Sequence, residues 1–154
     1  MKQNNKYVFV DYEGTLSEAP KASVTIAKLL FNDVFTKLKP NPKVKEFLLK
    51  QDTRNIYVLG IIDTNREIEQ KEQWLKKHYR FIRQSNYIFV SSEHEKVEII
   101  SEFIKYKKIK PEDVIFIDDK QSHLNLVMTL GCQCVLAANI LDSLVKDTGG
   151  QVKL

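Results

Sequence analysis

The sequence predicts an α/β fold, a doubly wound three-layer α/β/α sandwich around a five-stranded, mainly parallel sheet. Short runs of β-branched and aromatic residues alternate along the chain with longer segments of helical periodicity. The short runs are almost continuously apolar, as in parallel strands that are covered on both faces. A chain of 154 residues fits one domain. We therefore expect a single domain over residues 1–154, with its core over about 7–146 and a flexible tail over 147–154.

The strands are predicted from the five apolar runs, each followed by a polar or glycine-containing turn. The first and fourth runs end in acidic residues, and the last follows Gly131, which is expected to close the preceding helix. The predicted strands cover residues 7–11, 56–61, 87–90, 114–117 and 133–136.

Helices are predicted where apolar residues recur at a helical spacing between these strands. Asn41 can cap a helix that begins at Pro42, and Asn65 precedes an acidic first turn, which favours a helix start. Pro111 ends the region before the fourth strand. The predicted helices cover residues 24–37, 42–49, 66–78, 95–107, 122–130 and 141–146.

The composition indicates a folded, soluble protein. Apolar residues make up 43% of the chain and charged residues 29%, a balance that excludes a disordered chain. No apolar run reaches the roughly 18 to 20 residues of a membrane span, and the start does not read as a secretory signal. The net charge of +4 is spread over predicted helix faces, which disfavours a nucleic-acid partner without excluding one. Cys132 and Cys134 are expected to be reduced thiols in a cytoplasmic protein.

Acidic residues follow two of the predicted strands. Asp11 and Glu13 come at the end of the first strand, and Asp118 and Asp119 at the end of the fourth. Ligands of open α/β sheets bind beyond the carboxyl ends of the strands, so these carboxylates are expected to converge. Unpaired carboxylates would repel one another, and hard oxygen ligands favour Mg²⁺. The sequence therefore predicts a magnesium site at this edge of the sheet.

These motifs resemble those of the haloacid dehalogenase-like (HAD) superfamily of phosphotransferases, whose fold is Rossmann-like. Residues 11–15 (DYEGT) are similar to its first motif, Asp-x-Asp-Gly-Thr, and the strand that ends in Asp118 and Asp119 is similar to its fourth. Lys96 stands where its third motif has a lysine. The resemblance covers about residues 7–136 and implies a phosphatase.

The resemblance also implies a role for each matching residue. Asp11 would be the nucleophile and would form an aspartyl-phosphate, and Lys96 would neutralise the transferring group. Glu13 would be the general acid and base. Gly14 and Thr15 would shape the phosphate-binding loop. Bound Mg²⁺ would contact Asp11, the backbone carbonyl of Glu13, and two further aspartates, Asp118 and Asp119.

Two positions depart from the family pattern. Glu13 stands where the family has aspartate, and its extra methylene moves the carboxyl group. The second family motif, a serine or threonine at the end of the second strand, is irregular. Either Gly60 has lost that hydroxyl or Thr64 supplies it from the following loop. Both alternatives are compatible with the sequence.

The connections after the first two strands leave no room for a large cap domain. Residues 16–55 and 65–86 are already used by the predicted helices. The chain thus resembles the capless magnesium-dependent phosphatases of this superfamily. A phosphorylated partner is expected, either a macromolecular phosphomonoester or a small molecule enclosed by oligomerisation.

Three functions are weighed on these residues. The first is a Mg²⁺-dependent phosphomonoester hydrolase that acts through Asp11. The second is a catalytically impaired, HAD-like regulatory module that binds Mg²⁺ and phosphate, motivated by Glu13 and Gly60. A receiver-like protein is disfavoured because Val90 is followed by serines rather than a nucleophilic aspartate. His78, His94 and His123 do not have the spacing of metal ligands, and His94, near Lys96, is expected at the surface rather than in contact with substrate.

Overall fold

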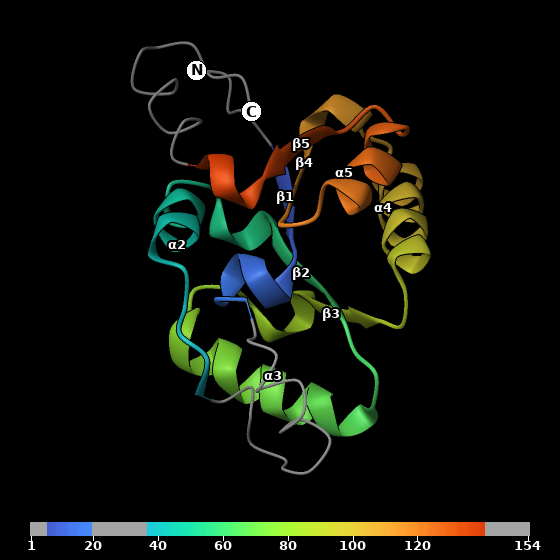
Figure 1. The fold of residues 1–154 in the computed structure, drawn as a ribbon. Helices are drawn as coiled ribbons and strands as arrows, with labels where there is room; N and C mark the ends of the chain where they lie inside the picture. The colour runs from blue at the N-terminus through green and yellow to red at the C-terminus, as the bar shows by residue number, and fades with distance from the viewer. Residues whose placement is uncertain (1–5, 20–36, 141–154) are drawn as a thin grey trace.

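A parallel sheet with the strand order β3-β2-β1-β4-β5 forms the centre of the computed structural model, which describes residues 6–19 and 37–140 (Figure 1). Every pair of neighbouring strands is parallel. The predicted fold is confirmed, and the strand bounds differ from the prediction only at Asp11, which follows β1, and at Asp118, which closes β4. The strands are β1 Tyr7–Val10, β2 Ile56–Ile61, β3 Tyr87–Val90, β4 Val114–Asp118 and β5 Gln133–Leu136.

The strand order places β1 between the two halves of the sheet. The chain runs outward from β1 to β2 and β3, and then crosses to β4 and β5 on the other side. Val10 lies opposite Val58 on β2 and opposite Ile117 on β4. The backbone N–H of Asp11 continues the ladder by donating to the carbonyl of Ile117 over 2.9 Å. Asp11 and the end of β4 therefore lie side by side at the switch point, where ligands of such sheets bind.

Four helices lie among the described residues, close to their predicted positions. Asn41 caps the first of them by accepting from the backbone N–H of Lys43 over 3.1 Å, as predicted. The next begins at Asn65 and is capped at Thr64, so Asn65 is not the cap that the sequence suggested. Two predicted helices and the predicted tail lie outside the described residues. The helices are those over 24–37, of which only residue 37 is described, and over 141–146. The helices are α2 Pro42–Leu49, α3 Asn65–His78, α4 Glu93–Lys107 and α5 Gln121–Met128.

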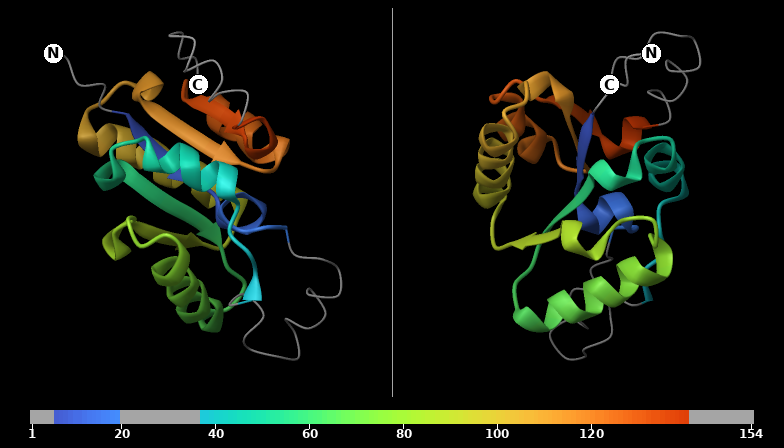
Figure 2. Two further views of the ribbon diagram at one scale, coloured as in Figure 1. Left: turned by 90° about the vertical axis from the view of Figure 1, so that its left-hand side faces the viewer. Right: turned by 180° about the vertical axis from the view of Figure 1, so that it is seen from behind.

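The helices form two layers, one on each face of the sheet (Figure 2). Val8 and Val10 point to the face that α2 and α3 cover, where Trp74 is buried in the core. Phe9, between them in sequence, points to the other face, under α4 and α5. Burial of both faces explains why the strands read as continuous apolar runs.

The loop after β1 is tied back to the chain before α2. Ser17 forms an antiparallel bridge with Pro40, and the backbone N–H of Asn41 donates to the carbonyl of Leu16 over 2.9 Å. The buried Tyr79 hydroxyl donates to the same carbonyl over 2.7 Å. These bonds fix the loop that carries Glu13, Gly14 and Thr15 against α3.

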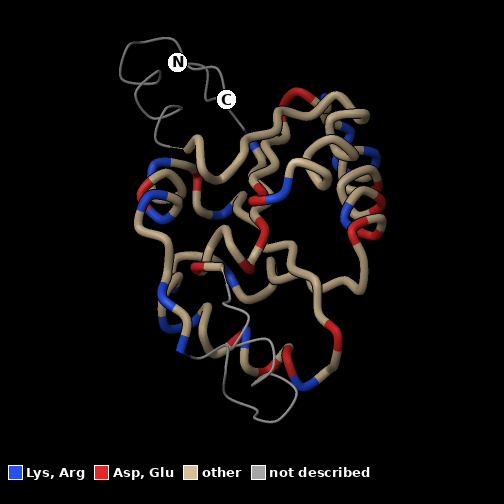
Figure 3. The backbone as a smooth tube through the Cα atoms, in the orientation of Figure 1, with Lys and Arg blue, Asp and Glu red and all other residues tan. Residues whose placement is uncertain are grey.

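Three further expectations concern the distribution of charge, membrane-spanning segments and the state of the cysteines. Acidic and basic positions are interspersed along the helices rather than separated by sign (Figure 3). Within the described ranges, no helix combines the length and apolar character that crossing a bilayer requires. Cys132 and Cys134 are both free thiols, as expected.

Candidate functional site

Three aspartates meet where β1 and β4 end. Asp11, Asp118 and Asp119 each offer a carboxylate oxygen within 4.8 Å of the others, and they form the group of potential metal ligands in the described part of the chain. Asp11 is only 6% exposed and Asp118 is fully buried. The adjacent positions of β1 and β4 cause this convergence, as the strand-end pattern predicted.

A buried lysine lies between two of these carboxylates. The Lys96 ammonium contacts Asp11 Oδ1 at 2.7 Å and Asp118 Oδ2 at 3.0 Å. Ser92 caps α4 by accepting from the backbone N–H of Glu95, so that Lys96 stands in the helix's first turn. Burial opposes a charged ammonium, but the two carboxylates outweigh it and raise the pKa of Lys96. The structure places Lys96 against Asp11 and Asp118, and its role in phosphoryl transfer stays a prediction.

The three aspartates differ in their pKa values because the Lys96 ammonium contacts only two of them, Asp11 and Asp118. Burial raises the pKa of Asp11, and the charge of Asp118 adds to the effect. Burial also acts on Asp118, but the nearby Lys96 holds the pKa of Asp118 below its ordinary value. Burial and the charge of Asp11 raise the pKa of Asp119 to about 7. The group thus holds more negative charge than it can balance and retains a proton near neutral pH.

The loop after β1 fits closely around the carboxylates. The Thr15 hydroxyl donates to Asp11 Oδ2 over 3.1 Å and fixes that side chain. Gly14 has a φ of +78°, and a Cβ at this position would collide with the Asp119 carboxylate. Both residues therefore lie beside the acidic group, and their role in binding phosphate stays a prediction.

Glu13 is held by a lysine that sequence reasoning missed. Its carboxylate Oε1 lies 3.0 Å from the Nζ of Lys71, a fully buried side chain on α3. Lys71 also donates to the carbonyl of Ile61 over 2.8 Å and lies 3.6 Å from Glu67 Oε1. No local motif marks Lys71, because its burial results from packing between α3, β2 and the loop after β1.

A histidine of the site was also missed. His123, for which the sequence indicated no role, is only 8% exposed. Its Nδ1 lies 2.9 Å from Asp118 Oδ2, and its Nε2 lies 3.0 Å from Glu93 Oε2. His123 therefore links the start of α4 to the end of β4. One sequence feature could have indicated this position. His123 lies in the first turn of the helix that follows Asp118 and Asp119, so its side chain can point back toward the end of β4. His94, by contrast, is exposed.

The two candidates for the second family motif are placed differently. Gly60 lies inside β2 opposite Phe89, and a Cβ there would lie 3.1 Å from the Cβ of Tyr12. The structure does not bring Gly60 to the carboxylates. Thr64 is exposed at the start of α3, where its backbone N–H donates to Glu67 Oε2 over 2.9 Å. Thr64 thus lies in a loop that faces the same edge of the sheet.

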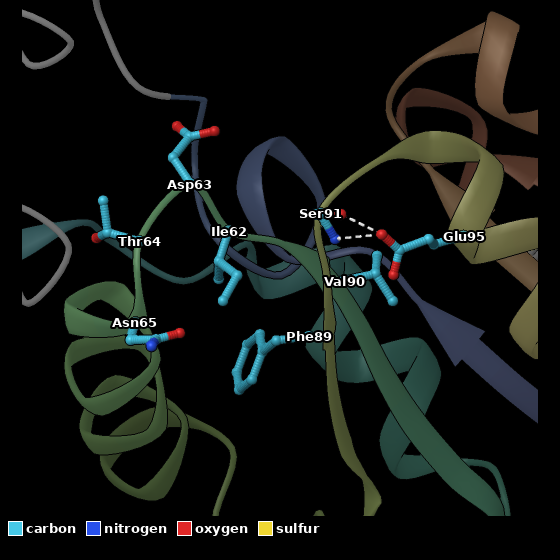
Figure 4. Close-up of a pocket in the computed structure, with 8 residues that line it drawn as sticks. All are labelled: Ile62, Asp63, Thr64, Asn65, Phe89, Val90, Ser91 and Glu95. Carbon is cyan, nitrogen blue, oxygen red and sulfur yellow. Dashed lines mark hydrogen bonds between the residues drawn. The ribbon is translucent and has the colours of Figure 1, made fainter.

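A cavity of about 520 Å³ opens at the ends of β2 and β3. Both apolar and polar side chains line it. Ser91 fixes Glu95 at its side through the backbone N–H, over 3.3 Å, and through the hydroxyl (Figure 4). Neighbouring strands lie about 4.8 Å apart, so the cavity starts roughly one to two strand spacings from Asp11. The lining residues are Ile62, Asp63, Thr64, Asn65, Phe89, Val90, Ser91 and Glu95.

Comparison with known families gives one match. The family model described as "Protein of unknown function (DUF2608)" matches residues 44–134. This range contains Lys96, Asp118 and Asp119, whereas Asp11 lies before it. No curated protein sequence matches the chain.

Comparison with solved structures shows the HAD-like fold. A HAD family enzyme from Bacteroides thetaiotaomicron, solved as a magnesium complex, has a TM-score of 0.54 at 15% identity, over 87% of this chain and 93% of that one. The HAD domain of the effector protein Lem4 from Legionella pneumophila has a TM-score of 0.54 at 13% identity, over 97% and 98% of the two chains. The N-terminal part of BF1531 from Bacteroides fragilis, which contains a phosphatase domain complexed with Mg, has a TM-score of 0.59 at 15% identity, over 92% and 39%. The expected fold is confirmed.

Proposed function

The chain belongs to the DUF2608 family, and from its site we propose that it is a Mg²⁺-dependent phosphatase of phosphomonoesters. The observation that carries this proposal is the group of three aspartates around the buried Lys96 ammonium at the switch point of the sheet. The solved structures with this fold that contain magnesium, two of which contain inorganic phosphate as well, support it.

The donor set fits Mg²⁺. Three carboxylates offer hard oxygen ligands within 4.8 Å of one another, and a single lysine ammonium leaves their negative charge in excess. We assign the metal to Asp11, Asp118, Asp119 and the backbone carbonyl of Glu13. Bound there, Mg²⁺ would neutralise charge on the phosphoryl group and on the carboxylates around it.

The side chains present can carry out hydrolysis in two steps. A carboxylate oxygen of Asp11 forms a bond to phosphorus while the bond from phosphorus to the leaving oxygen breaks, and Glu13 gives its proton to that oxygen. Water then gives a proton to Glu13 and bonds to phosphorus as the bond to Asp11 breaks, which releases inorganic phosphate. Lys96 and Thr15 hold the Asp11 carboxylate in place throughout.

The alcohol part of the substrate has room next to this centre. We assign it to the cavity at the ends of β2 and β3, which is large enough for a small organic group and has both apolar and polar side chains in its lining. We assign Thr64, at the rim of this cavity, as the hydroxyl donor to the phosphoryl group in place of Gly60, which lies inside β2. The substrate class is a phosphomonoester with a partly apolar alcohol.

Hydrolysis of 4-nitrophenyl phosphate with and without Mg²⁺ tests the function. Wild type should turn over only with the metal, and Asp11→Asn should lose at least 100-fold in kcat while its thermal unfolding stays cooperative. Asp113→Asn is the matched control, because Asp113 precedes β4 and lies at the opposite end of that strand from the site. Turnover by Asp11→Asn at the rate of the control would refute the mechanism.

A second function is favoured by one observation. Glu13 is already engaged in an ion pair with Lys71, as a carboxylate without catalytic duty would be. The protein would then be a regulatory module that binds Mg²⁺ and phosphate. In that case both ligands raise the melting temperature of wild type while no phosphomonoester is hydrolysed.

A further inference from the structure

Lys71 is a buried cation that the proposed reaction leaves without a role. Its side chain has no exposed surface, and its ammonium lies against the carbonyl of Ile61 and the carboxylates of Glu13 and Glu67. The ring of Tyr12 lies 5.0 Å from the same ammonium. A buried ammonium is costly unless it is paired, so these oxygen partners stabilise its place in the core.

The partners of Lys71 come from separate parts of the chain. Glu13 belongs to the loop after β1, Ile61 closes β2, and Glu67 lies in the first turn of α3. Glu67 in turn accepts from the backbone N–H groups of Asp63 and Thr64, over 2.7 and 2.9 Å. Lys71 therefore connects the loop that carries Glu13 to the loop that carries Thr64, and a helix of 14 residues holds it in place.

The length of the Glu13 side chain matches this arrangement. The distance from Glu13 Oε1 to Lys71 Nζ is 3.0 Å, a close ion pair. An aspartate at position 13 has one methylene fewer, which would withdraw the carboxylate by up to about 1.5 Å and open the contact. Glutamate in place of the family's aspartate thus has a geometric reason in this chain.

We propose that Lys71 is the positioning residue of Glu13, and that Glu13 and Lys71 act as a pair in place of a lone aspartate. This inference rests on the proposed phosphatase function. One carboxylate oxygen of Glu13 is held by Lys71, while a third of the side chain stays exposed at the edge where substrate would bind. The pair fixes the direction from which Glu13 transfers a proton to the leaving oxygen.

Comparison of two substrates distinguishes this role from a structural one. Propyl phosphate has a leaving alkoxide that requires a proton, whereas 4-nitrophenyl phosphate has a leaving group that departs without one. Loss of a correctly held acid therefore slows the alkyl substrate selectively. Loss of metal or phosphate binding slows both substrates alike.

The variants are Lys71→Met, Lys71→Arg and Glu13→Gln. The control is Glu67→Gln, which weakens a different ion pair of the same lysine. We expect Lys71→Met to lower kcat for propyl phosphate by about 100-fold and for 4-nitrophenyl phosphate by less than about 10-fold, with KM unchanged. Lys71→Arg should restore part of the loss. Glu67→Gln should change both rates by the same factor.

Combination of the variants gives the second readout. If Lys71 acts through Glu13, then Lys71→Met adds little to the loss already caused by Glu13→Gln. If Lys71→Met does not fold, Glu13→Gln and Lys71→Arg still test the pair. Both should fold, because Glu13 is partly exposed and arginine keeps the positive charge. In that case, a loss of kcat that is larger for propyl phosphate than for 4-nitrophenyl phosphate, in both Glu13→Gln and Lys71→Arg, supports the pair.

Two different results would overturn the inference. Equal losses on both substrates, or losses that multiply in the double variant, would show that Lys71 only stabilises the fold. The proposed phosphatase function would then remain. Failure of wild type to hydrolyse either substrate with Mg²⁺ would refute the phosphatase function and the positioning role together.

Discussion

Replacement of Lys96 by methionine is expected to destabilise the protein strongly, because two buried carboxylates lose their shared cation. Lys96 Nζ lies 2.7 Å from Asp11 and 3.0 Å from Asp118, and its side chain is 1% exposed. Removal of one partner from a buried ion pair costs about 3–5 kcal/mol. In a domain of this size such a loss lowers the melting temperature by about 10 °C.

Thermal unfolding followed by circular dichroism in EDTA measures the effect. The control is Lys105→Met on the same helix, since Lys105 is 72% exposed and its ion pair with Glu102 spans 3.7 Å. That variant should change stability by less than about 0.5 kcal/mol. If Lys96→Met melts within 2 °C of this control at about neutral pH, the stability of the fold does not depend on Lys96 to balance the two carboxylates.

The pH dependence of the same variant follows from the direction of the Asp118 shift. Lys96 holds the pKa of Asp118 below its ordinary value, so the pair stabilises the fold above that ordinary value and loses its effect as pH falls. The difference between wild type and Lys96→Met should therefore be present in full near pH 7 and shrink as pH falls below about 4. A cation should compensate in part, so millimolar Mg²⁺ should raise the melting temperature of Lys96→Met more than that of wild type.

Three further results are expected. The pKa of Asp119 is raised to about 7, which favours the protonated native state, so the stability of the metal-free protein should fall as pH rises from about 4 to 7. Mg²⁺ competes with that proton, so the rise in melting temperature that Mg²⁺ causes should grow from pH 5 to 8. A Mg²⁺-induced rise that does not depend on pH would contradict this. Gly14→Ala should abolish the Mg²⁺-induced rise in melting temperature in titrations with Mg²⁺. The control Gly131→Ala imposes a similar backbone strain away from the site, so it should lower stability but keep the Mg²⁺-induced rise. Burial raises the pKa of Cys132 to about 11 and that of Cys134 to about 12, so neither thiol should react with iodoacetamide at pH 7.5 until denaturant is added, as mass spectrometry would show.

The fold could be predicted from the sequence because parallel strands leave a direct signal. Three of the predicted strands, 56–61, 87–90 and 133–136, agree with the structure residue for residue. Burial on both faces makes each strand an unbroken apolar run. The helix caps were harder to predict. Asn65 has a favourable cap side chain, yet α3 is capped one residue earlier, because Glu67 binds the backbone N–H of Thr64.

The acidic part of the site was predictable for the same reason. Asp11, Asp118 and Asp119 follow strands, and the topology of a doubly wound sheet brings those strand ends together. Lys71 and His123 were not predictable in this way. A lysine or histidine on a helix is most often solvated, and only the packing of that helix on its neighbours shows that these two are buried beside carboxylates.

The two buried lysines of this edge have different charge surroundings, and the difference indicates where a cation belongs. Lys71 lies between two glutamates, both of which have other partners or exposed surface. Lys96 lies within a group of three aspartates, two of them buried, so that negative charge exceeds positive charge even with His123 close by. A divalent cation is therefore favoured beside Lys96. Glu13 pairs with Lys71 instead, and in the proposed mechanism it would be the group that transfers the proton.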